Sequence, residues 1–163
     1  MTNVFQEEKF NPITELEIGD VKYKAKGSLA FDRKAKDFAT KNEEGKKEGT
    51  GIQAIYNGLL NRNSESIIQF WICALAHKKE LKEKDIEEAV EKIIDEKDDT
   101  IELLQGAVTV LNDSGFFKQQ IKMFWFQMSQ AHKLVKDDEK EEAKKAHEFM
   151  KETYVILTGK QPY

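Results

Sequence analysis

ELEIGDVKYKAK, residues 15–26, is the one clear strand signal in this chain. Apolar residues alternate with glutamates before Gly19-Asp20 and with lysines after it, and alternation of this kind is typical of half-buried strands. The Gly19-Asp20 pair readily takes the positive φ values of a tight turn. The pattern therefore predicts a β-hairpin in which glutamates of one strand face lysines of the other. Because a lone hairpin is marginal in water, its apolar face must lie on helices or on another subunit.

Beyond the hairpin the spacing of apolar residues changes to a helical period. We expect Asp32 to cap the first helix, Ser64 a later one, and Asp99 or Thr100 another. The charged residues 41–50 contain two glycines and predict an exposed link. We expect a mainly α fold, in which a small N-terminal β-hairpin is followed by a bundle of about six helices, with a charged C-terminal helix. The expected helical segments are residues 31–39, 52–60, 64–75, 85–95, 100–111, 116–135 and 137–157.

The domain organisation follows from length and from changes in pattern. A chain of 163 residues suits one domain and is long enough to bury a core. We expect a flexible N-terminus over residues 1–12 and a hairpin plus helical domain over 13–135. Residues 136–163 are expected to form a charged helix with a disordered end from 158 to 163.

Composition and charge exclude several classes of protein. The 26 basic and 30 acidic residues give a net charge of −4, whereas DNA-binding domains usually carry a basic excess. Lysine pairs such as Lys78-Lys79 alternate with glutamates and indicate a solvated face, so we expect no nucleic-acid partner. The apolar runs are far shorter than the ~20 residues that span a bilayer, and the first residues do not resemble a secretory signal. We therefore expect an intracellular protein with no membrane partner.

Motifs for catalysis and ligand binding each lack a necessary part. The GxGxxA pattern of residues 49–54 follows a charged segment instead of the strand that a dinucleotide site needs. Residues 95–99 are acidic but lack the glycine of a calcium loop. Lys151 stands where a zinc-protease helix starting at His147 needs its second histidine. Cys73, the single cysteine, lies in an apolar helical segment that favours an inert thiol. We expect no enzyme activity, no cofactor and no metal.

An aromatic cluster in residues 116–128 does not fit the description of a plain surface helix. A helix that is apolar on all sides lies either in the core or against a partner, and the sequence leaves both interpretations open. Large aromatic residues anchor many protein interfaces, and methionines adapt to irregular partners. The candidate partner-binding residues are Phe116, Phe117, Phe124, Trp125, Phe126 and Met128.

The order of these elements resembles the tail assembly chaperones of long-tailed, siphovirus-type bacteriophages or prophages of Gram-positive bacteria. The resemblance covers roughly residues 10–120, and its most specific parts are IGDVKY at residues 18–23 and DSGFF at residues 113–117. It implies a helical, self-associating protein that binds the tape measure protein and keeps it soluble until tail tube subunits polymerise around it. It also implies a protein of the infected host's cytoplasm, absent from the virion, with a longer form made by ribosomal frameshifting.

Two other functions remain open from the sequence. The first is a small helical adaptor or regulatory protein-binding module unrelated to tail assembly, and the second is an enzyme with an unrecognised helical active site. Gene order distinguishes the first from a chaperone, because a chaperone gene would precede a very long helical reading frame.

Overall fold

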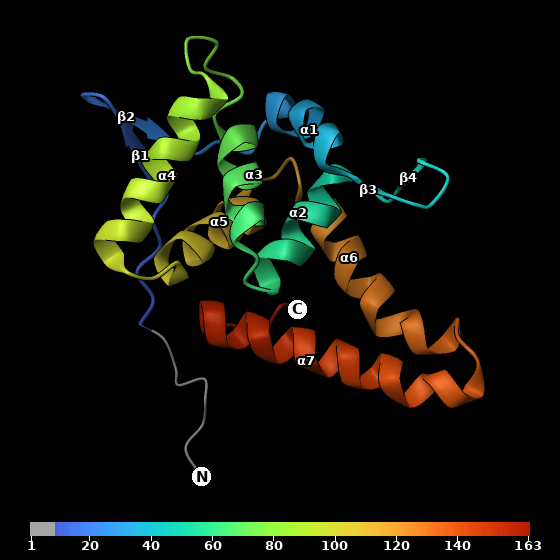
Figure 1. Ribbon diagram of the computed structural model, residues 1–163. Helices are drawn as coiled ribbons and strands as arrows, with labels where there is room; N and C mark the ends of the chain where they lie inside the picture. The colour runs from blue at the N-terminus through green and yellow to red at the C-terminus, as the bar shows by residue number, and fades with distance from the viewer. Residues whose placement is uncertain (1–8) are drawn as a thin grey trace.

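The structure is a computed structural model that describes residues 9–163 (Figure 1). It confirms the hairpin: β1 (Glu15–Ile18) pairs with β2 (Val21–Lys24) in antiparallel register, with Glu15 opposite Lys24 and Glu17 opposite Lys22. The opposed charges are therefore placed as the sequence predicts. Only Gly19 of the turn has a positive φ, +64°, as the first central residue of a type II′ turn does.

Helices of the same chain cover the apolar side of the hairpin. Leu16 is fully buried, and Ile18 and Tyr23 pack at the edge of the core. β1 lies against α4 (Glu83–Lys97), and just before β1 the N–H of Ile13 donates to the carbonyl of Glu102 in α5 (Ile101–Asp113). The apolar side of β1 therefore lies on helices of the same chain, while Val21 of β2 is 51% exposed.

The mainly α class is confirmed, with the hairpin at its start. A second small hairpin, which the sequence analysis did not predict, lies in the exposed link and consists of β3 (Thr40–Lys41) and β4 (Lys47–Glu48). Short 3-10 turns, η1, η2 and η3, occupy Lys36–Phe38, Ala131–Lys133 and Asp137–Glu139. The remaining helices are α1 (Leu29–Ala35), α2 (Gly51–Leu60), α3 (Ser64–Ala74), α6 (Lys118–Gln130) and α7 (Lys140–Thr158).

Two predicted helix caps are wrong by a few residues. Ser28, not Asp32, caps α1: its hydroxyl accepts from the N–H of Phe31, while Asp32 lies in the first turn. Asn63, not Ser64, caps α3. Both corrections have one cause, because several residues near each start have side chains that can accept a bond, and only the backbone decides which of them precedes the first turn.

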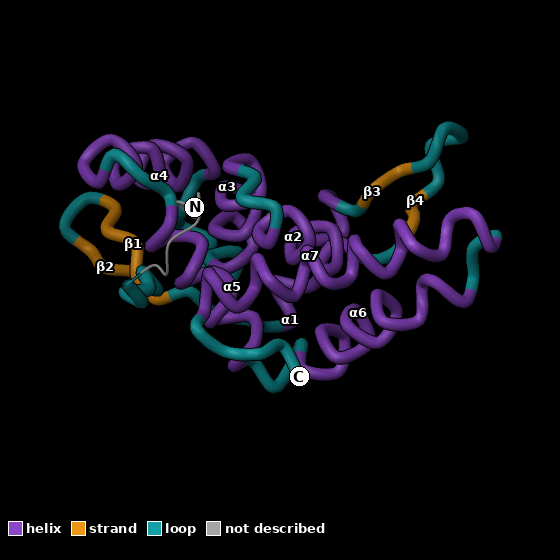
Figure 2. The backbone as a smooth tube through the Cα atoms, turned by 90° about the horizontal axis from the view of Figure 1, so that it is seen from below, coloured by secondary structure: helices purple, strands orange, loops and turns teal. Residues whose placement is uncertain are grey.

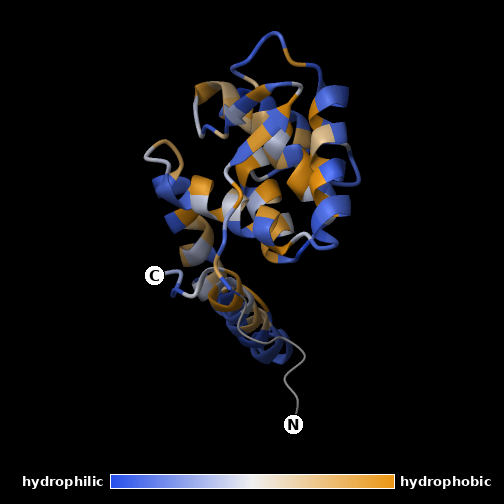
Figure 3. Ribbon diagram, turned by 90° about the vertical axis from the view of Figure 1, so that its left-hand side faces the viewer, coloured by the Kyte–Doolittle hydropathy of each residue, from blue (hydrophilic) through white to orange (hydrophobic). Residues whose placement is uncertain are grey.

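One core connects the hairpin to the helices, and an arm projects from it. The helices α1 to α5 form the body, α6 runs away from it and α7 returns across the body (Figures 1 and 2). Side chains of α7, among them Met150 and Tyr154, belong to the same buried cluster as those of α2, α3 and α5. Between Trp125 and Met150 no residue is buried, so the far part of this arm has little core of its own. Figure 3 shows apolar residues gathered in the body and many hydrophilic ones along α7.

The described parts of both chain ends are held by specific contacts. The predicted flexible N-terminus falls largely on residues 1–8, which lie outside the described residues, but Asn11 donates from its backbone N–H to Gln105 Oε1 at 2.9 Å. At the other end we expected disorder, whereas the Tyr163 hydroxyl lies 2.7 Å from His147 Nε2. The division at residue 135 stays a prediction, although α7 shares the core of the preceding segment.

Candidate functional site

The six candidate partner-binding residues divide between the core and the surface. Phe117 and Trp125 are fully or almost fully buried, and Phe124 is 9% exposed. Phe116 and Phe126 are 48% and 59% exposed. The sixth, Met128, is partly buried at the edge of the core. The core interpretation therefore applies to the buried members, because one face of α6 meets the body. Partner binding stays a prediction for the exposed members on the other face.

The buried face of α6 is fixed by edge-to-face aromatic contacts. Phe117 packs on Phe31 of α1 with ring centroids 5.1 Å apart. Phe124 packs on Tyr56 of α2 at 5.1 Å. Such pairs add about 0.5–1.5 kcal/mol each beyond the burial of their area. These contacts therefore set the direction in which α6 leaves the body.

A chain of hydrogen bonds joins four helices beneath this face. Trp125 Nε1 donates to the Tyr56 hydroxyl at 3.2 Å, and that hydroxyl donates to Asn112 Oδ1 at 3.2 Å. Asn112 Nδ2 in turn donates to the Tyr154 hydroxyl at 2.6 Å. Burial raises the pKa of Tyr56 and also that of Tyr154, so both phenols stay protonated and neutral at physiological pH. The chain links α2, α5, α6 and α7 and satisfies the polar atoms of an otherwise apolar region.

The open face of α6 carries large apolar side chains. Met123 is 49% exposed and lies close along the helix to Phe126. Beside Phe126 is a cavity of about 320 Å³ that is lined by Ile121, Lys122, Trp125, Phe126, Ser129, Pro162 and Tyr163. We refer to Phe116, Met123, Phe126 and Tyr163 as the α6 surface. Exposed large apolar side chains grouped in this way are typical of protein-binding surfaces.

Tyr163 joins this surface from the C-terminal end of the chain. Its ring stacks on His147 with an interplanar angle of 2°, and Lys151 Nζ lies 5.5 Å from its centroid. Its ring centroid is also 6.1 Å from that of Trp125. Burial lowers the pKa of His147, and the nearby Lys151 charge acts in the same direction. Tyr163 was not among the residues predicted from the sequence, where its only signal is an aromatic residue at the end of a polar segment.

The outer part of the arm exposes two more large apolar side chains. Leu134, between α6 and α7, is 85% exposed, and Phe149 of α7 is 57% exposed. The sequence analysis missed both residues, because it placed only residues 116–128 at a binding surface. A second cavity, of about 290 Å³, lies on the other flank of α6, where Phe124 and Met128 face residues of α2 such as Gln53. Exposed apolar side chains therefore occur at separate places along the arm.

The motifs tested for chemistry have structural roles. Asp98 ends α4 with a left-handed φ of 54°, and the Asp99 carboxylate accepts from the N–H of Ile101 at the start of α5. Thr50 and Gln53 form a reciprocal capping box at the start of α2. Burial raises the pKa of the Cys73 thiol to about 12, so it is no nucleophile at neutral pH. Within residues 9–163 no three His, Cys, Asp or Glu side chains are grouped to hold a metal ion.

No helix in the described part of the chain combines the length and the apolar character needed to cross a bilayer.

Comparison with known proteins identifies the family. A family model described as phage tail assembly chaperone protein, TAC, matches residues 15–125. The match begins at β1 and ends at Trp125, so it contains the hairpin, the helical body and the inner half of α6. No curated protein and no solved structure matches the chain. Because the match covers well over half of the 163 residues, the chain belongs to the phage tail assembly chaperone family.

Proposed function

We propose that this chain binds the tape measure protein of a long-tailed phage or prophage and keeps it soluble until the tail tube polymerises around it. The observation that carries the proposal is the α6 surface, where Met123 and Phe126 are about half exposed in a chain of this family. Most large apolar residues of the chain are used in the core, so exposed ones grouped on one helix favour a binding role.

The physical requirements of the task agree with this surface. A tape measure protein exposes long apolar helical segments before the tube encloses them, and such segments aggregate. A chaperone must cover these segments and later release them, which several moderate contacts allow better than one deep pocket. Phe126 and Met123 provide such contacts, while the charged residues of α7 keep the complex in solution.

The proposal includes the setting of the chaperone. The chain would act in the cytoplasm of the infected bacterium, would associate with itself, and would be absent from the finished virion. A longer form made by frameshifting, and the tail tube subunits, would be further partners, and the hosts would be Gram-positive. This role requires no catalysis, cofactor or nucleic acid.

Co-expression tests the proposal directly. The tape measure protein, expected as a very long helical reading frame downstream of this gene, is produced in bacteria with and without this chain, and its soluble fraction is measured after lysis. We expect it to be soluble only in the presence of the chain and to co-purify with it. If it stays insoluble in both cases, or is soluble alone, the helical adaptor becomes the better account.

A further inference from the structure

Within residues 9–163 no strand pairs with the outer edge of β2. The N–H of Ala25 donates to the carbonyl of Thr14, which fixes the alternation of the antiparallel ladder. By this alternation the backbone groups of Tyr23 face β1, whereas those of Lys22 and Lys24 point to the outer edge. Among the described residues, Lys22 and Lys24 have no hydrogen-bond partner on that side. The next outward N–H, that of Lys26, donates to the Ala74 carbonyl at 3.1 Å, so the edge closes there.

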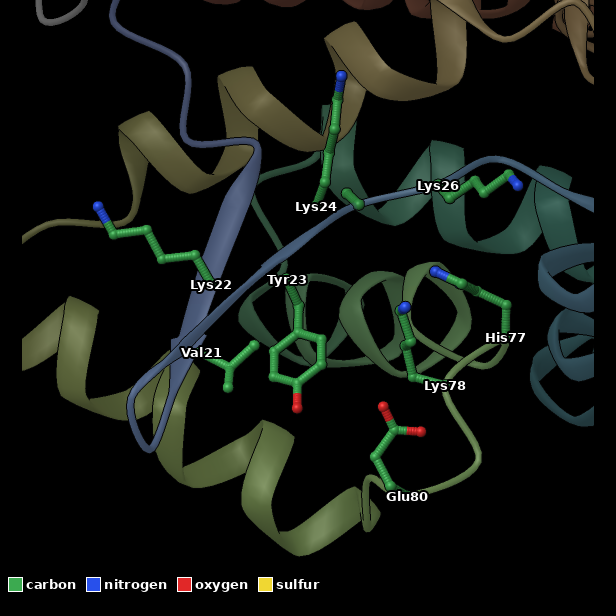
Figure 4. Close-up of a pocket in the computed structure, with 9 residues that line it drawn as sticks. Val21, Lys22, Tyr23, Lys24, Lys26, His77, Lys78 and Glu80 are labelled. Atoms are coloured by element: carbon green, nitrogen blue, oxygen red, sulfur yellow. The ribbon is translucent and has the colours of Figure 1, made fainter.

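A cleft of about 690 Å³ runs along this edge (Figure 4). One wall is residues 21–26, and the other is formed by His77, Lys78 and Glu80 of the segment between α3 and α4. In Figure 4 the side chains of Val21 and Tyr23 extend toward the side on which Lys78 and Glu80 lie. The side chains of Lys22 and Lys24 extend away from that side. On the side of β1, α4 lies against the hairpin, and the cavity between them is smaller, about 260 Å³. The volume of the cleft beside β2 is large enough to hold a short extended peptide.

The charges around the cleft favour an acidic peptide. Lys26 and Lys78 line the cleft beside Glu80, the one carboxylate among its described lining residues, while the side chains of Lys22 and Lys24 extend from the other face of β2. An added strand would place alternate side chains beside the lysines of β2 and the others beside Val21 and Tyr23. The chain already contains a strand with this pattern: β1 reads Glu-Leu-Glu-Ile and pairs with the opposite edge of β2.

We propose that the open edge of β2 binds an extended segment of a partner protein, with alternating acidic and apolar residues, as a third strand of the hairpin. Backbone hydrogen bonds from Lys22 and Lys24 would hold the segment, and the lysine side chains would select acidic residues. This site is separate from the α6 surface, and the inference does not depend on the tape measure protein being the client.

A synthetic peptide of alternating Glu and Leu or Ile, six residues long with a fluorescent label, is a suitable probe. We expect saturable binding by fluorescence anisotropy, and slower amide hydrogen exchange at Lys22 and Lys24. The matched control peptide has Lys in place of each Glu and is expected not to bind. The proposal would be overturned if the acidic peptide does not bind, or if it binds without changing hydrogen exchange at either amide. The lysines would then serve only to protect an edge strand from aggregation.

Variants of the full chain separate the site from the fold. Lys22→Glu combined with Lys24→Glu should weaken peptide binding roughly tenfold or more, since each reversal replaces a cross-strand attraction by a repulsion. Because these changes also place like charges opposite Glu15 and Glu17, Lys78→Glu on the other wall provides a second test that leaves the hairpin unchanged. Lys144→Glu on α7 is the control. Equal affinity of all these variants and the wild type would contradict the proposal.

Discussion

Trp125 and Phe126 are neighbours in the sequence, but their surroundings differ completely. Trp125 is 2% exposed, packs on Tyr154 with ring centroids 5.6 Å apart and donates to the Tyr56 hydroxyl. Phe126 is 59% exposed. Since adjacent positions of a helix are about 100° apart, one side chain can belong to the core while the next faces a partner.

This difference predicts opposite effects of two substitutions. Trp125→Ala should lower the free energy of unfolding by about 3–5 kcal/mol, because it leaves a cavity and removes the hydrogen bond to Tyr56. Phe126→Asp should change that free energy by less than about 0.5 kcal/mol, and it should reduce binding of the tape measure protein. Urea unfolding followed by circular dichroism measures the first effect, and a pull-down measures the second. Equal loss of stability in both variants would mean that Phe126 also belongs to the core.

The buried phenols predict a decrease in stability at alkaline pH. Burial raises the pKa of Tyr56 above its ordinary value of 10.0, and that of Tyr154 is raised too, so the unfolded chain loses these protons first. The free energy of unfolding should therefore fall above about pH 10, by up to about 1.4 kcal/mol per pH unit for each phenol.

Tyr56→Phe isolates this effect from the titration of the lysines. Urea unfolding is measured between about pH 9 and about pH 11, around the ordinary phenol pKa of about 10. The free energy of unfolding should depend less steeply on pH for the variant than for the wild type. The variant also loses the hydroxyl that joins Trp125 to Asn112, so it should be less stable at neutral pH. Identical pH dependence in the two proteins would show that Tyr56 does not titrate differently in the folded and unfolded states.

At the level of elements, the hairpin is joined to α5 by a close backbone approach. A Cβ atom added at Gly106 would overlap the backbone of Ile13, whereas one added at Gly115 would meet nothing within 4 Å. Gly106→Ala should therefore destabilise the fold by about 1–3 kcal/mol despite the better helix propensity of alanine. Gly115→Ala is the matched control and should have little effect. The measurement is the melting temperature of both variants. If the Gly106→Ala protein melts at the same temperature as the Gly115→Ala control, the close approach is contradicted.

Most elements could be predicted from the sequence, because their apolar residues follow a single period. Val90 of α4 and Leu16 of β1 are buried as their spacing indicates. The β3–β4 hairpin could not be predicted, since strands of two residues in a charged link have no apolar period. The candidate site was found only in part: the sequence located the aromatic cluster, but which of its residues face outward depends on how α6 meets the body. Tyr163 joins that site through a tertiary contact with His147 that no local pattern contains.

For the whole molecule, α7 lies outside the family match yet contributes to the common core. The family match ends at Trp125, while Met150, Tyr154 and Leu157 are buried against the body. Each of these side chains contributes about 1.5–3 kcal/mol when it is buried. A chain that ends at residue 135 should therefore melt at a temperature lower by more than about 5 °C, or aggregate. A chain that ends at residue 158 keeps these side chains, so its melting temperature should fall much less. An unchanged melting temperature of the shorter chain would instead support a separate domain over residues 13–135.

The central claim is that the exposed face of α6 binds the tape measure protein while its buried face holds the fold. The most direct measurement is co-purification of the tape measure protein with three forms of this chain: the wild type, Met123→Asp combined with Phe126→Asp, and Lys144→Ala combined with Lys145→Ala as a surface control on α7. We predict that the wild type and the lysine variant retain the tape measure protein in solution and that the α6 variant, still folded by circular dichroism, does not. If the folded α6 variant retains the tape measure protein as well as the wild type does, or if the wild type fails to retain it, the claim is contradicted.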